Sequence, residues 1–194
     1  PEKIENLEFL DLANGPFIQF QNNKATIKLE LKSKAANAFD GIIGFSTQND
    51  NSLQLTGNAM IDLNNTLRSG ENLYLNWRAP GRESQSLTLK SNFPYILQTP
   101  FGIDLQFELY KQDSSYLNLN FKAGMQYRFT FYNVVSVFLD HRSSNILSPS
   151  NPVNSQNLNY VFNGLGVSYK YEDIDNKILP HQGWRLKAEF SSGK

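Results

Sequence analysis

The sequence predicts an all-β fold made of antiparallel, up-and-down strands of a transmembrane β-barrel, with about nine strands of a larger barrel present. Three observations indicate this fold. Apolar and polar residues alternate in one segment after another, the alternating segments are long, and turn-forming residues stand where the alternation stops. A short α+β segment is expected before the first barrel strand.

The composition excludes several classes of protein. The chain has 194 residues, with 18 Lys and Arg balanced by 18 Asp and Glu, so it lacks the positive surplus that nucleic-acid binding needs. It has no Cys, which excludes disulfides, thiolate metal sites and a cysteine nucleophile. No stretch of about 18 apolar residues occurs, so a transmembrane helix is not expected.

The alternation is clearest from Ser52 to Leu63, where Leu53, Leu55, Ile61 and Leu63 share one face. Polar residues occupy the opposite face, and Met60 is the one apolar exception. Further strands are predicted over residues 40–47, 73–79, 87–93, 101–110, 117–128, 133–141, 160–171 and 184–190.

Turn signals separate these strands. They fall at Asn49–Asn51, Arg68–Gly70, Pro80–Gly81, Asp113–Ser115 and Asp173–Gly183. The longest break, Arg142–Asn159, is rich in Ser, Asn and Pro and is predicted to be a long loop.

The residues before Asp40 follow another pattern. A short helix is expected to place Ile4, Leu7 and Leu10 or Leu12 on one face, and Gly15-Pro16 would end it. A hairpin is expected next, pairing Phe17–Phe20 with Ala25–Lys32.

A soluble β-sandwich also alternates, so the membrane interpretation depends on other evidence. Eleven residues at about 3.4 Å each, tilted by about 40°, span roughly 28 Å, close to the apolar band of outer-membrane barrels. Aromatic residues gather near predicted strand ends, as an interfacial girdle requires. The predicted girdle comprises Trp77, Tyr95, Phe101, Tyr127, Phe129, Tyr132, Tyr171 and Trp184. Core aromatics of a sandwich remain the alternative.

The strand layout resembles the BamA/TamA-type outer-membrane assembly superfamily, which also includes the two-partner secretion transporters. The resemblance rests on the opening segment Asn37–Phe45, the turns Asp62–Leu73 and Phe93–Gly102, and the turn Asp173–Gly183 with its Pro180. The family's barrel has a further set of strands and an inward-folded loop with a Val-Arg-Gly-Phe motif, which this sequence lacks.

The resemblance implies a domain organisation and a location. Residues 1–36 would be the end of a POTRA-like periplasmic module, and residues 37–194 the first half of a barrel in a Gram-negative outer membrane. Parity agrees, because nine up-and-down strands cannot close antiparallel. The turns at Asn64–Glu71, Phe93–Phe101 and Asp173–Gly183 would be periplasmic, and the Arg142–Asn159 loop extracellular.

No catalytic constellation is predicted, and no cofactor or metal site. Asp173, Asp175 and His181 have metal-ligating side chains, but their spacing around a proline turn favours a solvated turn. Asp140 beside His141 suggests a proton relay only if a nucleophile accompanies them, and no motif supplies one.

The first barrel strand is the predicted functional element. Its residues Gly41, Ile42, Ile43, Gly44 and Phe45 would form one side of a lateral seam. Client strands would enter there by β-augmentation, and the glycines would keep the seam soft. The alternative is that the glycines relieve crowding where the POTRA linker enters.

Three functions remain open from the sequence. The first is insertion of outer-membrane proteins, whose partners would be outer-membrane lipid, unfolded clients, and periplasmic or lipoprotein accessory subunits. The second is a secretion pore or the membrane anchor of a fused passenger domain. The third is a soluble β-sandwich binding module.

Overall fold

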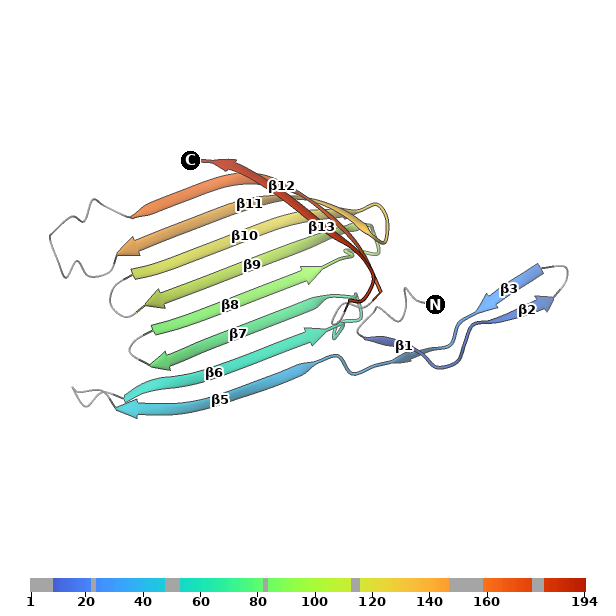
Figure 1. The fold of residues 1–194 in the computed structure, drawn as a ribbon, viewed down its shortest axis with the longest axis horizontal. Helices are drawn as coiled ribbons and strands as arrows, with labels where there is room; N and C mark the ends of the chain where they lie inside the picture. Colours follow the sequence, from blue (N-terminus) through green and yellow to red (C-terminus); the bar gives the residue numbers. More distant parts are fainter. Residues whose placement is uncertain are drawn as a thin grey trace. The chain divides into compact units, whose positions relative to one another are not determined.

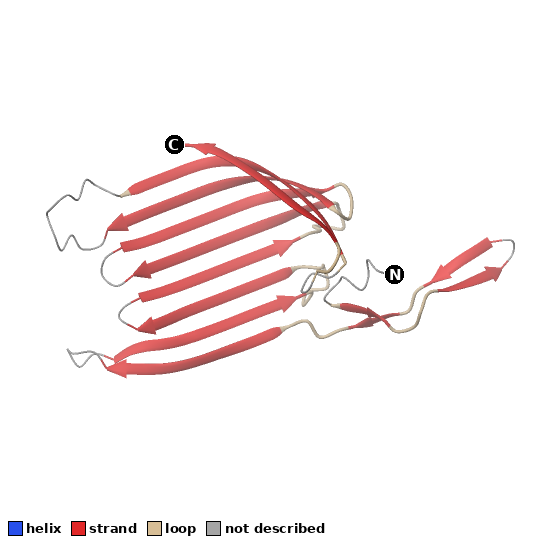
Figure 2. Ribbon diagram, in the orientation of Figure 1, coloured by secondary structure: helices blue, strands red, loops and turns tan. Residues whose placement is uncertain are grey.

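The computed structural model describes residues 9–21, 24–47, 53–81, 84–112, 116–146, 159–175 and 180–194. The described residues form thirteen β-strands and no helix (Figure 2). Accordingly, no helix in these ranges has the length and apolarity to cross a bilayer. The chain divides into two compact units, one of residues 1–36 and 172–185, the other of residues 37–171 and 186–194.

Nine strands form one antiparallel sheet in which neighbours in sequence are neighbours in space (Figure 1). The prediction of nine up-and-down strands is confirmed. Their bounds are β5 Ala38–Thr47, β6 Leu53–Asn64, β7 Asn72–Gly81, β8 Ser84–Phe93, β9 Phe101–Gln112, β10 Tyr116–Arg128, β11 Asn133–Ile146, β12 Tyr160–Ile174 and β13 Gly183–Gly193. The sheet is open, because β5 and β13 stand at its two ends and do not pair in the described residues.

The register separates apolar from polar side chains. Leu139 of β11 lies between Ala123 of β10 and Leu165 of β12, whereas the next residue, Asp140, lies between Lys122 and Gly164. Because successive residues of a strand point to opposite faces, the sheet has an apolar face and a polar face. The polar face carries Asp62, Arg78, Lys90, Asp104, Glu108, Lys122, Asp140 and Arg142.

The apolar face is largely uncovered. Met125, Leu139 and Leu165, on β10, β11 and β12, expose about three fifths of their surface. The buried apolar residues of the described chain are few: Ala79, Val134 and Phe138. The described sheet therefore has no second layer that would give it the buried core of a soluble sandwich.

The predicted boundary at Arg142 moves in the sheet. The loop predicted from Arg142 begins later, because Arg142–Ile146 continue β11 by pairing with Tyr116–Asn120 of β10. The predicted turns at Asn49–Asn51 and Asp113–Ser115, and residues 147–158 of the long loop, lie outside the described residues.

The N-terminal unit contains two short ribbons. β2 (Phe17–Gln21) pairs with β3 (Lys24–Lys28), which confirms the predicted hairpin as far as Lys28. The prediction that its second strand continues to Lys32 is wrong, because Leu31 and Lys32 belong to β4 (Leu31–Ser33), which pairs with β1 (Leu10–Leu12). The predicted helix is wrong at Leu10 and Leu12, because backbone pairing with β4 holds these residues extended. Its other residues, Ile4 and Leu7, lie outside the described ranges.

The turn between β6 and β7 is held by a buried carboxylate. Glu71, only 1% exposed, accepts hydrogen bonds from the Leu67 and Ser69 amides and from the Ser69 hydroxyl. Burial alone would raise the pKa of Glu71, but these hydrogen bonds outweigh it and lower the pKa below the ordinary value. They also fix a turn in which Asn65 and Arg68 have positive φ angles of 57° and 62°.

Candidate functional site

The predicted seam residues Gly41 to Phe45 lie in β5, an edge strand of the nine-stranded sheet. Among the described residues no strand pairs with the outer edge of β5. Ile43 and Phe45 lie on the apolar face and Ile42 on the polar face, and all three are at least 64% exposed. The edge strand therefore exposes large apolar side chains on both faces, with Asp40 and Ser46 beside Ile42 on the polar face.

The two seam glycines have different surroundings. A Cβ at Gly41 would lie 2.9 Å from the Asn58 carbonyl oxygen, so β6 approaches too closely for a larger residue. A Cβ at Gly44 would meet only the Thr56 hydroxyl, at an ordinary 3.5 Å. The close approach of the β6 backbone explains Gly41 and leaves Gly44 without a steric reason.

A third glycine, which the sequence did not single out, lies opposite Ile43. Gly57 has a φ of 137°, and a Cβ there would lie 2.0 Å from the Ile42 carbonyl oxygen. Only glycine adopts this backbone without strain. The β5–β6 pair therefore has a local irregularity beside the open edge.

Five predicted girdle residues make ring contacts near the β10–β11 turn. Phe101 and Tyr127 have ring centroids 5.1 Å apart, and Tyr127 lies 6.4 Å from Phe129. Tyr132 lies 6.2 Å from Tyr171. These rings gather at the end of the sheet where the β8–β9 and β10–β11 turns lie.

The other three girdle residues are not members of these ring pairs. Tyr95 in the β8–β9 turn stacks against the Arg128 guanidinium, 5.8 Å from its ring centroid. Trp77 lies in mid-strand, between Ala59 and Leu87. Trp184 is the second residue of β13 and is 79% exposed.

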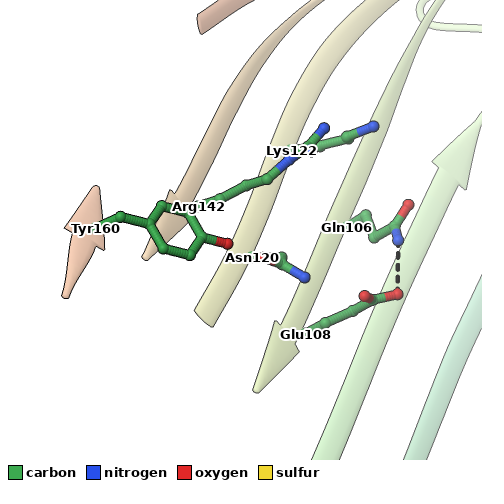
Figure 3. Close-up of a pocket in the computed structure, with 6 residues that line it drawn as sticks. All are labelled: Gln106, Glu108, Asn120, Lys122, Arg142 and Tyr160. Carbon is green, nitrogen blue, oxygen red and sulfur yellow. Dashed lines mark hydrogen bonds between the residues drawn. The ribbon is translucent and has the colours of Figure 1, made fainter. Parts of the chain in front are cut away.

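The polar face holds a hollow that sequence reasoning missed (Figure 3). It is lined by Gln106, Glu108, Asn120, Lys122, Arg142 and Tyr160, which come from strands β9 to β12. Its volume, about 310 Å³, is at the lower end of the range for small-molecule sites. The charges on the polar positions were visible in the sequence, but only the register brings them together.

Asp140 and His141 do not form a relay, because they lie on opposite faces. The Asp140 carboxylate is fully buried and accepts hydrogen bonds from Arg142 Nε at 3.0 Å and Nη2 at 2.5 Å. His141 Nδ1 lies 2.6 Å from the Asn163 side-chain oxygen on the apolar face.

The Asp175 carboxylate stabilises the β12–β13 turn. It accepts hydrogen bonds from the backbone amides of His181 at 3.0 Å and Gln182 at 3.1 Å. Asp173 lies on the other side of this turn, in β12, where its carbonyl oxygen would lie 2.1 Å from a Cβ at Gly183. In the ranges that the structure covers, no three carboxylate or imidazole groups gather as metal ligands would.

Comparisons with known proteins show a match in structure and none in sequence. No protein-family model matches the chain, and no curated protein matches it. Among solved structures, the chain is similar to BamA from Haemophilus ducreyi lacking POTRA domains 1–3. The identity is 15%, the TM-score is 0.49, and the match covers 98% of this chain and 40% of that one. The chain therefore spans less than half of the structure it matches.

Proposed function

We propose that the nine-stranded sheet is part of a β-barrel in a Gram-negative outer membrane, and that this barrel inserts other outer-membrane β-proteins along the edge of β5. The observation that carries the proposal is the edge strand itself. β5 has an open edge and exposed apolar side chains on both faces, and it continues a sheet whose apolar face is uncovered.

The dimensions of the strands support the membrane. The nine strands have 10 to 15 residues each. At about 3.4 Å per residue and a tilt of about 40°, the shortest of them spans roughly 26 Å, close to the ~25 Å apolar band of such barrels. The charged residues lie on the polar face of the sheet, which would line a water-filled lumen.

The chemistry of an open edge supports the insertion activity. Every second residue of β5 directs its amide and carbonyl away from β6, and inside a bilayer such groups need partners. An incoming strand with the same need satisfies both edges by β-augmentation. Gly57 of β6 has a backbone conformation that other residues avoid, and no close contact requires a glycine at Gly44 of β5. Both features make β5 easier to displace than a fully packed strand.

The proposal is tested by disulfide trapping, since the chain has no cysteine of its own. The full-length protein is placed in lipid vesicles with Gly44→Cys, and an unfolded outer-membrane protein with one cysteine in a terminal strand is added. A cysteine at this position fits, because only an ordinary contact lies nearby. The matched control is Gln106→Cys, on the same face of β9 but paired on both sides.

We expect disulfide-linked client at Gly44→Cys and none at Gln106→Cys, together with faster client insertion than in empty vesicles. Equal capture at both positions, or unaccelerated insertion, would contradict the proposal. Heat-modifiable gel migration of both variants shows beforehand that the barrel is folded.

A further inference from the structure

On the polar face between β10 and β12, the side chains of Phe138 and Asp140 are buried and form a floor. Glycines on the neighbouring strands leave room for Phe138. Phe138 lies between Gly124 and Gly166 in the register and is 7% exposed. A Cβ at Gly166 would lie 2.3 Å from the Phe138 ring, and one at Gly124 would lie 3.0 Å from its Cβ. Gly166 therefore leaves room for the Phe138 ring, and Gly124 leaves room for its Cβ.

Asp140 is the second member of this floor. Its side chain has no exposed surface, and a carboxylate buried in this way costs several kcal/mol unless it is paired. Arg142 pairs with it from the side, through Nε and Nη2. This geometry leaves Nη1 and the second Nη2 hydrogen directed away from Asp140.

Phe162 completes the support of the guanidinium. Its ring centroid lies 5.7 Å from Arg142 Cζ, and a Cβ at Gly164 would come within 2.7 Å of the same ring. Arg142 is thus held by a carboxylate on one side and an aromatic face on another, while 42% of its side chain stays exposed. A guanidinium fixed in this way loses little freedom when it binds a ligand.

Lys122 is held similarly on the neighbouring strand. Its ammonium lies 5.0 Å from the Phe138 ring centroid and forms an ion pair with Glu189 of β13. Lys122 and Arg142 line the same hollow, with Asn120 and Tyr160 as further hydrogen-bond donors (Figure 3).

Glu108, the carboxylate that lines the hollow, already has partners of its own. It accepts a hydrogen bond from Gln106 at 2.7 Å, and its Oε1 lies 4.0 Å from the Lys90 ammonium. The hollow therefore offers more directed donors than free acceptors.

We infer that this hollow is a binding site for an oxyanion, a phosphate or carboxylate group held by Arg142 and Lys122. Arg142 provides the two directed hydrogens of a fork, and Lys122 provides a point charge beside it. Asp140 is a positioning residue that orients Arg142. The inference depends on the sheet alone, and not on the activity proposed for β5.

The test is a titration of the full-length protein in detergent with inorganic phosphate and, separately, with acetate. The readout is the Nε–H NMR signal of arginine, which is visible for a clamped guanidinium and moves when an anion binds. We expect one signal to shift saturably, and the stronger of the two anions distinguishes a phosphate from a carboxylate ligand.

Because substitution of Arg142 removes its own signal, binding to the Arg142 variants is followed by the side-chain amide signal of Asn120, which lines the same hollow. Arg142→Gln should weaken this binding about tenfold or more, as loss of a charge-assisted hydrogen bond does. Arg78→Gln is the matched control, because Arg78 lies on the same face with no hydrogen-bond or ion-pair partner among the described residues, and it should leave binding unchanged. Asp140→Asn should broaden the clamped signal while the guanidinium charge remains.

Because Asp140→Asn can also impair folding, as can Arg142→Gln by leaving the buried Asp140 carboxylate without its partner, Arg142→Lys is the second variant. It keeps the charge and loses the fork, so it should fold normally and bind several-fold more weakly. The inference is overturned if neither anion gives a saturable shift, or if Arg78→Gln weakens binding as much as Arg142→Gln.

Discussion

A charge placed on the apolar face of β12 should destabilise the protein far more than the same charge one residue later. Val167 lies on the apolar face beside Val137, and Ser168 lies on the polar face beside Ser136. An arginine that faces lipid at mid-membrane costs about 2–4 kcal/mol, and one that faces a water-filled lumen costs little. Val167→Arg should therefore lower the free energy of unfolding by about 2–4 kcal/mol, and Ser168→Arg by less than about 0.5 kcal/mol.

The exposure of Val167 makes this contrast informative. Half of its surface is exposed, so in water an arginine there would have an effect of only about ±0.5 kcal/mol. A large cost thus requires something apolar around the sheet. Val161, on the same face near the start of β12, provides the depth control, because near the interface the cost falls to about 0–1 kcal/mol.

The measurement is equilibrium unfolding of the full-length protein in lipid vesicles with a denaturant, followed by tryptophan fluorescence. The membrane interpretation is refuted if Val167→Arg and Ser168→Arg change stability equally. It is also refuted if Val161→Arg costs as much as Val167→Arg, since a protein core would show no such depth dependence.

Two turns and one strand position give further predictions. Glu71→Gln should cost about 2 kcal/mol, because it removes the charge from hydrogen bonds to the Leu67 and Ser69 amides. Since the folded-state pKa of Glu71 is lowered, the carboxylate's contribution to folding stability is complete above the ordinary value of 4.5 and is lost as pH falls below it. The difference between the unfolding midpoints at pH 7 and pH 3.5 should therefore be smaller in Glu71→Gln than in the unsubstituted protein. Gly57→Ala should cost about 3 kcal/mol or more, since its Cβ would meet the Ile42 carbonyl, whereas Gly81→Ala, with a φ of 108° and open space, should cost only about 1 kcal/mol. Equal denaturation midpoints for these two alanine variants would disprove the steric explanation.

The sequence predicted the nine-stranded sheet because strand periodicity is local. Each alternating segment shows its two faces without knowledge of its neighbours, and short turns leave only up-and-down pairing. The helix expected through Leu10 and Leu12 failed for the opposite reason. Their extended conformation comes from pairing with Leu31–Ser33, some 20 residues away, and local spacing does not report such a partner.

The candidate sites show the same contrast between local patterns, which the sequence reveals, and contacts between distant residues, which it does not. The residues from Gly41 to Phe45 were predicted as one segment because they are consecutive, and the structure places them in one strand, β5. The oxyanion hollow was missed because Lys122, Asp140 and Arg142 meet only through the registers of β10 and β11, which follow from turn lengths and from shear. The β8–β9 turn is another case, since Leu97 and Gln98 adopt φ angles of 51° and 62° that their residue types do not favour.

The separation of Asp140 from His141 has a consequence for how these strands can change. Along β11 two sets of residues alternate: odd positions belong to the apolar face of the sheet and even positions to the polar face, and each set can change without altering the other. Insertion or deletion of a single residue within β11 would move every following side chain to the opposite face of the sheet. A strand of this kind therefore tolerates many substitutions but very few changes of length.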